Sequence, residues 1–331
     1  IPVGIALLIA GFATYAFFKV GVAAVGGDEE FEPITSLWFT TFALAPGFFL
    51  PLEQELGRAL AHRRAIGQGT RPVVRKIVLL GAGLTALVVL VIAAASQILA
   101  DSLFDGNMFM VLALVLAFSA YAPAHLARGI CSGSGRFRQY GIILASDGVV
   151  RIVLCIALAV VGVTAAGAYG LAVAVSPLFA VGYVYIRGGL HTEDGPPASW
   201  IEVTPNLGWL LLGSIFAASL LNAGPIAASL LADDDQAAQV TQFSYGVLLA
   251  RIPLFLFQAV QAALLPRLSR LAARGEFDEF RSGLKKLMYV VLVVGVVGTS
   301  GAFLLGPWVI EIVYDAELSG RTLALLAFSS A

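Results

Sequence analysis

The chain has 331 residues, of which 59% are apolar and 12% are charged, and its net charge is −1. Soluble domains contain roughly 45–50% apolar and about 25% charged residues. This composition therefore excludes an ordinary water-soluble domain and predicts a surface that faces mostly lipid.

The predicted elements are membrane-spanning helices. A bilayer core about 30 Å thick requires around 20 apolar residues per helix, and the sequence divides on that scale at glycine, proline and charge clusters. We predict nine full spans and the start of a tenth, so the expected fold class is all-α and polytopic. In chain order the predicted spans are 3–25, 34–52, 77–100, 107–127, 140–162, 166–186, 206–232, 238–265, 286–305 and 320 to the end.

The connections between these spans alternate in charge. Sixteen of the 20 basic residues lie in the connections after the second, fourth, sixth and eighth spans, whereas the alternate connections together hold twelve acidic residues and only one basic residue, Arg321. Cytoplasmic connections retain Lys and Arg. We therefore expect a multi-pass protein of the plasma membrane with a cytoplasmic N-terminus. Because no basic region precedes the first apolar run at Ile1, we also expect a piece of a longer protein without a signal peptide.

An internal repeat relates the two halves of the chain. Leu50-Pro51 closes the second span, and Leu265-Pro266 closes the eighth in the same way. Further on, Leu103-Phe104-Asp105 matches Val313-Tyr314-Asp315 at a slightly smaller offset. Copies separated by an even number of spans predict two parallel halves, related by an axis along the membrane normal. The expected domains are an N-terminal lobe at 1–190, a cytoplasmic linker at 191–204 and a partial C-terminal lobe at 205–331.

Two kinds of connection need a structural interpretation. The segments after Pro51 and Pro266 have the pattern of amphipathic helices, and in the second the spacing suits a helix at the level of the lipid headgroups. Such a helix is either a topological anchor or part of a substrate gate. The glycine-rich stretch from Arg128 to Arg136 follows a membrane helix instead of a strand, so we expect a flexible basic connection and no phosphate loop.

The cysteines and histidines indicate no further chemistry. Cys131 and Cys155 form no CxxC or metal spacing, so we expect neither a disulfide nor a metal site. The histidines are scattered without ligand spacing and are assigned no chemical role; they are His62, His125 and His191.

Four ionisable residues fall within predicted spans: Lys19, Asp147, Arg151 and Arg251. A charge facing lipid at the helix centre costs about 2.5–3.5 kcal/mol on insertion scales, so each should face a cavity or a partner. Asp147 and Arg151 are four residues apart and share a helix face. They form either an internal salt bridge or a site where Asp147 takes up a coupling ion that Arg151 senses.

Arg251 precedes Pro253, which removes a backbone donor and bends the helix. Carbonyls opened beside a cation suggest a cavity wall. The position of the first half that corresponds to Arg251 in the repeat is Ser36, so the arginine is not a repeated structural element. Lys19 either faces the cavity or extends to the outer membrane surface. Pro46 and Pro225 are further candidate hinges, with packing kinks as the alternative.

Together these features resemble the polysaccharide-export branch of the multidrug/oligosaccharidyl-lipid/polysaccharide (MOP) flippase superfamily. The resemblance covers essentially the whole chain and implies two parallel six-helix lobes around a central cavity, with the second lobe truncated in this chain. The cavity of this family opens alternately to either side and moves undecaprenyl-pyrophosphate-linked sugars outward. The chain departs from the pattern by ending inside the tenth span and by lacking an arginine in the second. The matching features are the two Leu-Pro stretches with their basic connections, the Arg128 to Tyr140 connection, the Asp147/Arg151 pair and Gly306-Pro307-Trp308.

The expected function is export of a lipid-linked oligosaccharide or polysaccharide precursor. A pyrophosphate carried through lipid needs positively charged partners, which gives Arg251, Lys19 and Arg151 a substrate-binding role and Asp147 an ion-coupling role. We expect no enzymatic activity, no catalytic residue, no cofactor and no nucleic-acid partner. The expected partners are the anionic lipid-linked sugar, membrane lipids and polysaccharide polymerase or glycosyltransferase machinery.

Other functions remain open at this stage. The closest alternative is a drug or small-molecule exporter of the same fold. An exporter of cations should carry an excess of acidic cavity residues, whereas this chain has an excess of basic ones. A glycosyltransferase or sugar-chain polymerase needs a sizeable exterior loop, and every exterior connection here is short. A major-facilitator carrier has a short connection after the second span, where this chain has the long segment from Pro51 to Arg75. A membrane scaffold without transport activity is the last alternative.

Overall fold

The computed structural model describes residues 2–204, 207–233, 236–251 and 276–330, and all regular elements in these ranges are helices. Eight of the described helices are long and apolar enough to cross a membrane. They correspond to the first seven predicted spans and the ninth. The predicted eighth span, 238–265, continues beyond the described residues. The prediction of an all-α polytopic membrane protein is therefore confirmed.

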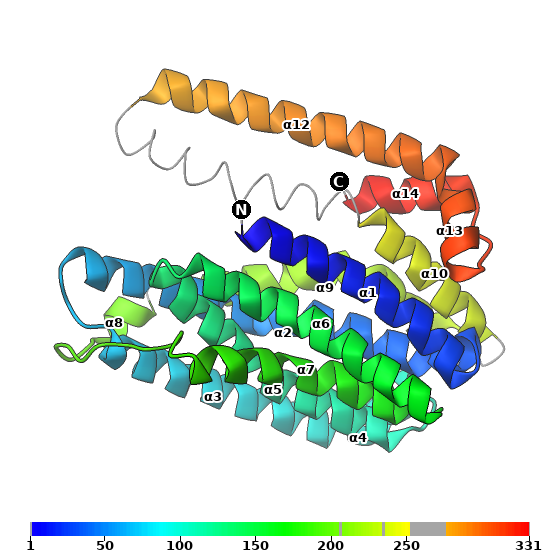
Figure 1. The fold of residues 1–331 in the computed structure, drawn as a ribbon, viewed down its shortest axis with the longest axis horizontal. Coiled ribbons are helices and arrows are strands. Elements are labelled where there is room, and N and C mark those ends of the chain that lie inside the picture. The colour runs from blue at the N-terminus through cyan, green and yellow to red at the C-terminus, as the bar shows by residue number, and fades with distance from the viewer. Residues whose placement is uncertain (1, 205–206, 234–235, 252–275, 331) are drawn as a thin grey trace.

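The first seven helices form one packed unit, which occupies the lower part of Figure 1. Within it, α1 packs on α6, α2 on α5, and α7 on both α5 and α6. Buried aromatic rings connect α1 to α2, with Phe17 stacked on Trp38 at 5.4 Å between ring centroids. The helices are α1 (Pro2–Val25), α2 (Asp28–Ala65), α3 (Arg71–Ala94), α4 (Ser96–Leu103), α5 (Met108–Gly133), α6 (Phe137–Val161) and α7 (Ala166–Ile186).

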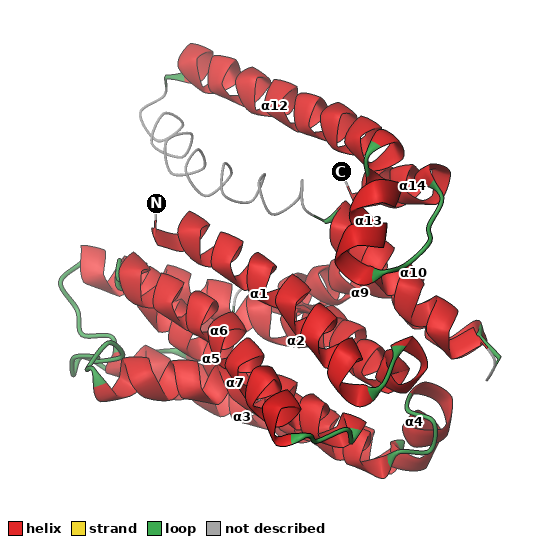
Figure 2. Ribbon diagram, turned by 45° about the vertical axis from the view of Figure 1, so that its right-hand side comes forward, coloured by secondary structure: helices red, strands yellow, loops and turns green. Residues whose placement is uncertain are grey.

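The remaining helices form the second half. α9 packs along α2 of the first unit, and α10 contacts both α2 and α14. α12 forms the outer edge in Figures 1 and 2 and packs against α14, α13 and α10. These helices are α8 (Trp200–Val203), α9 (Leu207–Leu231), α10 (Ala237–Ala250), α12 (Phe277–Leu304), α13 (Gly306–Tyr314) and α14 (Gly320–Ser330).

The two ends of the bundle differ in charge. The turns that follow α1, α4 and α6 lie at the end drawn on the right of Figure 1, which we call the acidic end. The connections that follow α2, α5 and α7 lie at the opposite end, which we call the basic end. The alternation of charge along the sequence therefore becomes a separation of charge between the two ends.

The internal repeat is visible in the helix boundaries. α3 ends at Ala94 and α12 ends at Leu304, and the short helices that follow them, α4 and α13, begin at the same interval in both copies. The aspartates that follow these short helices, Asp105 and Asp315, have φ values of 49° and 56°. A left-handed conformation is uncommon for residues other than glycine. Its recurrence at equivalent positions shows that the sequence repeat is also a repeat of backbone structure.

The segment after Pro51 is helical, as its amphipathic pattern predicts, but it continues the second span without a break at the proline. α2 continues through Pro46 and Pro51 for 38 residues and ends at Ala65. Leu52, Leu56 and Leu60 remain buried at helical spacing beyond Pro51, because this part of α2 packs on α5. The burial of these side chains overcomes the loss of a single backbone donor at the proline. The matching segment after Pro266 lies outside the described residues.

The glycine-rich connection also differs from its prediction. Residues up to Gly133 continue α5, so only the short stretch from Ser134 to Arg136 connects it to α6. A Cβ atom at Gly129 would lie 2.8 Å from the backbone oxygen of Glu53. The glycine therefore allows α5 to approach the backbone of α2 closely, and the expected flexible connection is instead a tight helix contact.

The predicted linker region is held against the basic end of the first unit. Arg71 forms an ion pair with Asp194 at 2.7 Å and donates to the backbone oxygen of Thr192. Arg63, which is buried, forms an ion pair with Glu202 at 2.6 Å and donates to the backbone oxygen of Pro196. The basic residues of this end therefore bind the chain that leads into α9.

Candidate functional site

Asp147 and Arg151 on α6 form a charged pair inside the first unit. An Arg151 Nη atom lies 2.6 Å from Asp147 Oδ2. The Ser176 hydroxyl donates to Oδ1 at 2.6 Å, and the Tyr121 hydroxyl donates to Oδ2 at 3.2 Å. The guanidinium carbon also lies 4.6 Å from the centre of the Trp38 ring. Both carboxylate oxygens are thus occupied by protein groups, which is the arrangement of a buried internal salt bridge.

A prediction follows for this pair. Replacing Arg151 with Met leaves the Asp147 carboxylate without its cation, which should lower the yield of folded protein. The loss should stay below the roughly 3–5 kcal/mol of a fully broken buried pair, because Tyr121 and Ser176 still donate to the carboxylate.

The measurement is the melting temperature and the monodisperse fraction after purification in detergent. The double variant Asp147→Leu/Arg151→Met should recover the stability of the parent protein. A stable Arg151→Met variant that has lost only transport would instead support the ion-coupling role.

Arg251 lies where α10 meets the first unit. An Nη atom of Arg251 donates to the side-chain oxygen of Asn222 on α9 at 2.9 Å, and the guanidinium carbon lies 5.4 Å from the centre of the Phe39 ring on α2. The nearby Tyr15 hydroxyl on α1 donates to the backbone oxygen of Leu248 at 2.6 Å. Three helices of different parts of the chain therefore converge on the last turn of α10.

Pro46 explains why Asn222 reaches across to α2. A proline has no backbone N–H, so the carbonyl four residues earlier, that of Phe42, has no helical partner. The Asn222 amide approaches this carbonyl at 3.4 Å and donates at 2.8 Å to Ala218 in its own helix. The next residue, Gly47, would place a Cβ atom 3.0 Å from the backbone of Ile215. The Pro46-Gly47 step thus forms a close contact between α2 and α9 beside Arg251.

The predicted site residues do not gather in one cluster. Arg151 is buried inside the first unit, Arg251 lies at the seam with α10, and Lys19 is exposed on α1. The aromatic residues of α2 separate the two arginines, because Trp38 contacts Arg151 and Phe39 contacts Arg251. Pro225 lies within α9, which runs unbroken through it. Pro253 lies outside the described residues.

A second buried charged cluster was missed by the sequence analysis. Glu53 on α2 accepts hydrogen bonds from Arg128 Nε at 3.0 Å and from the Tyr140 hydroxyl at 2.9 Å. His125 Nδ1 lies 2.9 Å from the same carboxylate. The side chains of Glu53 and His125 are 6% and 4% exposed, so His125 has electrostatic partners that its position in the sequence did not indicate. The signal that could have found this cluster is the helical spacing of leucines across Pro51, which places Glu53 on a buried face.

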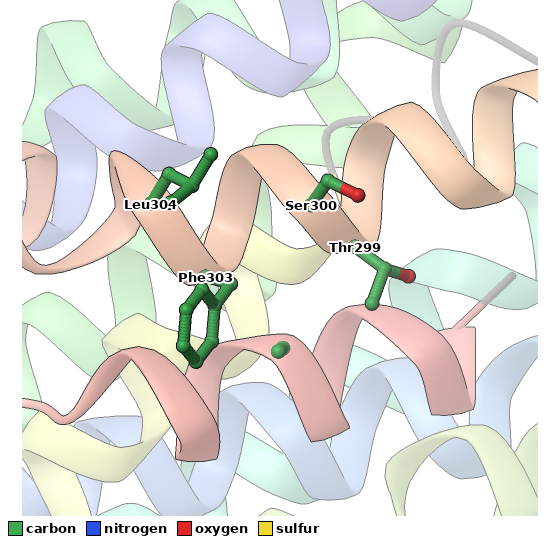
Figure 3. A pocket seen from close by; sticks show the side chains of 5 residues that line it. Thr299, Ser300, Phe303 and Leu304 are labelled. Atoms are coloured by element: carbon green, nitrogen blue, oxygen red, sulfur yellow. The ribbon is translucent and has the colours of Figure 1, made fainter.

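The described pockets lie elsewhere. A shallow pocket of about 360 Å³ between α12 and α14 is lined by Thr299, Ser300, Phe303, Leu304 and Ala324 (Figure 3). No charged residue lines it. In the described parts of the chain, no group of three or more His, Cys, Asp and Glu side chains could hold a metal ion.

Comparison with known proteins gives the fold and one partial family match. Residues 203–319 match the model of the lipid II flippase MurJ family. No curated protein is similar enough in sequence to be matched. An outward-facing multidrug-resistance transporter of the MATE family, in the MOP superfamily, superposes with a TM-score of 0.69 at 14% identity, covering 98% of this chain and 76% of that chain.

Other solved structures agree. An inward-facing multidrug-resistance MATE transporter gives a TM-score of 0.65 at 14% identity, covering 98% of this chain and 79% of that one. A MOP-superfamily transporter from Pyrococcus furiosus, described as having a binding pocket of reverse polarity, superposes with a TM-score of 0.66 at 12% identity. The match covers 99% of this chain and 76% of that chain. The chain therefore has the all-α fold of the transporters of the MOP superfamily.

Proposed function

We propose that this protein is a flippase that exports a lipid-linked oligosaccharide or polysaccharide precursor carrying a pyrophosphate. The observation that carries the proposal is the position of Arg251, where α10 meets the first unit and where its guanidinium donates to the side chain of Asn222 on α9. Arg251 also lies within the segment that matches the lipid II flippase family. A guanidinium held at such a seam can bind a phosphate oxygen pair through two donors.

The role of the other charged residues follows from their surroundings. Asp147 and Arg151 neutralise each other, so we assign them mainly to stabilising the first unit, with ion coupling as the alternative that the Arg151 variants test. Lys19 is exposed on α1, the helix that also carries Tyr15. It is a second cation available to an anionic headgroup moving along this helix.

The alternative function is export of a drug or another small molecule, which the structural similarity to MATE transporters favours. That similarity concerns the fold, and exporters of organic cations need acidic residues to bind their cargo. Arg251 presents the opposite charge at the seam. We therefore favour an anionic substrate, and we assign polysaccharide polymerase or glycosyltransferase machinery as the partners that would supply or consume it.

We also propose that the basic end faces the cytoplasm of the cell that carries the protein in its plasma membrane. Arg64 and Arg138 are exposed at this end, and Glu29 and Glu30 are exposed at the acidic end. Positively charged connections are retained on the cytoplasmic side. The N-terminus would then be cytoplasmic.

Cysteine labelling tests this orientation. Cysteine at Glu29 should react with an impermeant maleimide added outside intact cells, whereas cysteine at Arg64 should react only after the cells are opened. The native Cys131 and Cys155 are buried, so the parent protein is the control for background labelling. External labelling at position 64 with protection at position 29 would reverse the orientation.

The experiment that tests the proposed function is translocation of a fluorescent undecaprenyl-pyrophosphate-linked sugar in liposomes that contain the purified protein. Chemical quenching of the label in the outer leaflet measures the fraction of substrate that has crossed.

A further inference from the structure

The contact between α10 and the first unit at the acidic end centres on one carboxylate. Asp28, in the first turn of α2, accepts hydrogen bonds from the Tyr245 hydroxyl at Oδ1 and from the Gln242 amide at Oδ2, the latter at 3.1 Å. The Thr241 hydroxyl donates to the backbone oxygen of Asp28 at 2.8 Å. These four residues, which we call the Asp28 latch, connect the two halves of the chain.

Tyr245 is the central member of the latch. Its side chain is fully buried. Its ring stacks on that of Tyr314 from α13 at 4.3 Å and 6°, and it meets the edge of Phe18 from α1 at 6.2 Å. The hydroxyl of Tyr245 therefore binds the first unit, and its ring packs against both halves.

Tyr314, the stacking partner of Tyr245, has a buried hydroxyl that lacks a hydrogen bond within the described residues. Tyr314 is 6% exposed, and its hydroxyl has no hydrogen-bond partner among the residues that the structure describes. Leaving a buried hydroxyl unsatisfied is unfavourable. The contact between α10 and the first unit thus contains favourable hydrogen bonds to Asp28 and, beside them, the unfavourable buried hydroxyl of Tyr314.

We propose that the Asp28 latch is the gate that closes the acidic end of the protein, and that its bonds must break when this end opens. This inference rests on the proposed function, because alternating access requires the two halves to separate at each end in turn. Tyr245 stabilises the closed state through its hydroxyl, and the hydroxyl of Tyr314 destabilises it. Two tyrosines in one stack therefore have opposite effects on the same equilibrium.

The opening can be measured as a distance between the two halves. Asp101 on α4 and Glu311 on α13 are both exposed and occupy equivalent positions of the repeat. Spin labels at these sites, in a background where the buried Cys131 and Cys155 are replaced by Ala, report the separation of the acidic end by pulsed electron paramagnetic resonance. The measurement needs no substrate, so its result is independent of whether the protein transports a lipid-linked sugar.

Asp28→Ala and Tyr245→Phe should each raise the ratio of long to short distances, by roughly tenfold for the loss of hydrogen bonds to a charged group. Tyr245→Phe should have little further effect in the Asp28→Ala background, because its partner is already absent. Tyr314→Phe added to Asp28→Ala should shift the distances back toward the short ones. Glu29→Gln, an exposed neighbour with the same loss of charge, is the matched control and should leave the distribution unchanged.

Tyr245→Phe retains the ring and its packing, so it keeps the test valid if Asp28→Ala does not fold. Unchanged distances in folded Tyr245→Phe, or a shift as large in Glu29→Gln, would overturn the latch. If the distances confirm the latch but the protein moves no lipid-linked sugar, the proposed substrate is refuted and the gating role of the Asp28 latch is retained.

Discussion

Replacing Arg251 with Ala should reduce translocation of the pyrophosphate-linked sugar by roughly 30-fold or more. The reason is that removing one partner of a buried charged contact costs about 2–5 kcal/mol. Arg251→Lys should retain partial activity, because it keeps the positive charge and loses only the planar pair of donors. Initial rates in liposomes with matched amounts of protein provide the measurement.

Two controls separate binding from folding. Arg138 is an exposed arginine at the basic end, and Arg138→Ala should transport at the parent rate. The melting temperature of Arg251→Ala, measured beside its transport rate, shows whether the variant is folded and so separates a loss of binding from a loss of fold. Parent-level transport by Arg251→Ala would remove this residue from the substrate site and weaken the case for an anionic cargo.

The largest effect on stability is expected at Glu53. Glu53→Ala leaves the Arg128 guanidinium, whose side chain is 13% exposed, without its carboxylate and removes the partner of Tyr140 and His125. Breaking a buried pair in this way costs about 3–5 kcal/mol, a large part of the roughly 5–15 kcal/mol that stabilises a typical protein. We expect little folded protein, measured by fluorescence-detected size-exclusion chromatography after heating.

A matched acid on the same helix provides the comparison. Glu30 is exposed in the first turn of α2, and Glu30→Ala should melt within a few degrees of the parent protein. Glu53→Leu combined with Arg128→Met should recover part of the loss, because neither buried charge remains. A melting temperature for Glu53→Ala equal to that of the parent would show that the cluster does not stabilise the first unit.

The fold could be predicted from the sequence because a bilayer imposes simple rules. Span length, the alternation of charged connections and the internal repeat depend on composition and spacing, and each of these is readable without contacts. The repeat even anticipated matching backbone geometry at Asp105 and Asp315. The errors arose where packing outweighs a local signal, as at Pro51, where α2 continues because its leucines are buried against α5.

The candidate site could be predicted only in part. The pairing of Asp147 with Arg151 follows from their spacing on one helix, and the structure joins them at 2.6 Å. Glu53 and His125 are 72 residues apart in sequence, and no local pattern connects them. The same holds for Asn222 and Phe42, which are 180 residues apart in sequence and meet where α9 packs on α2. Contacts between helices far apart in the chain depend on packing that composition does not encode.

The most direct test of the central proposal compares cargoes in the same liposomes. The purified protein should move the fluorescent undecaprenyl-pyrophosphate-linked sugar from one leaflet to the other well above the rate in protein-free liposomes. A fluorescent organic cation should cross the membrane of these liposomes no faster than it crosses that of protein-free liposomes. Transport of the cation, with no movement of the lipid-linked sugar by a folded and correctly inserted protein, would contradict the proposed function and favour a drug exporter.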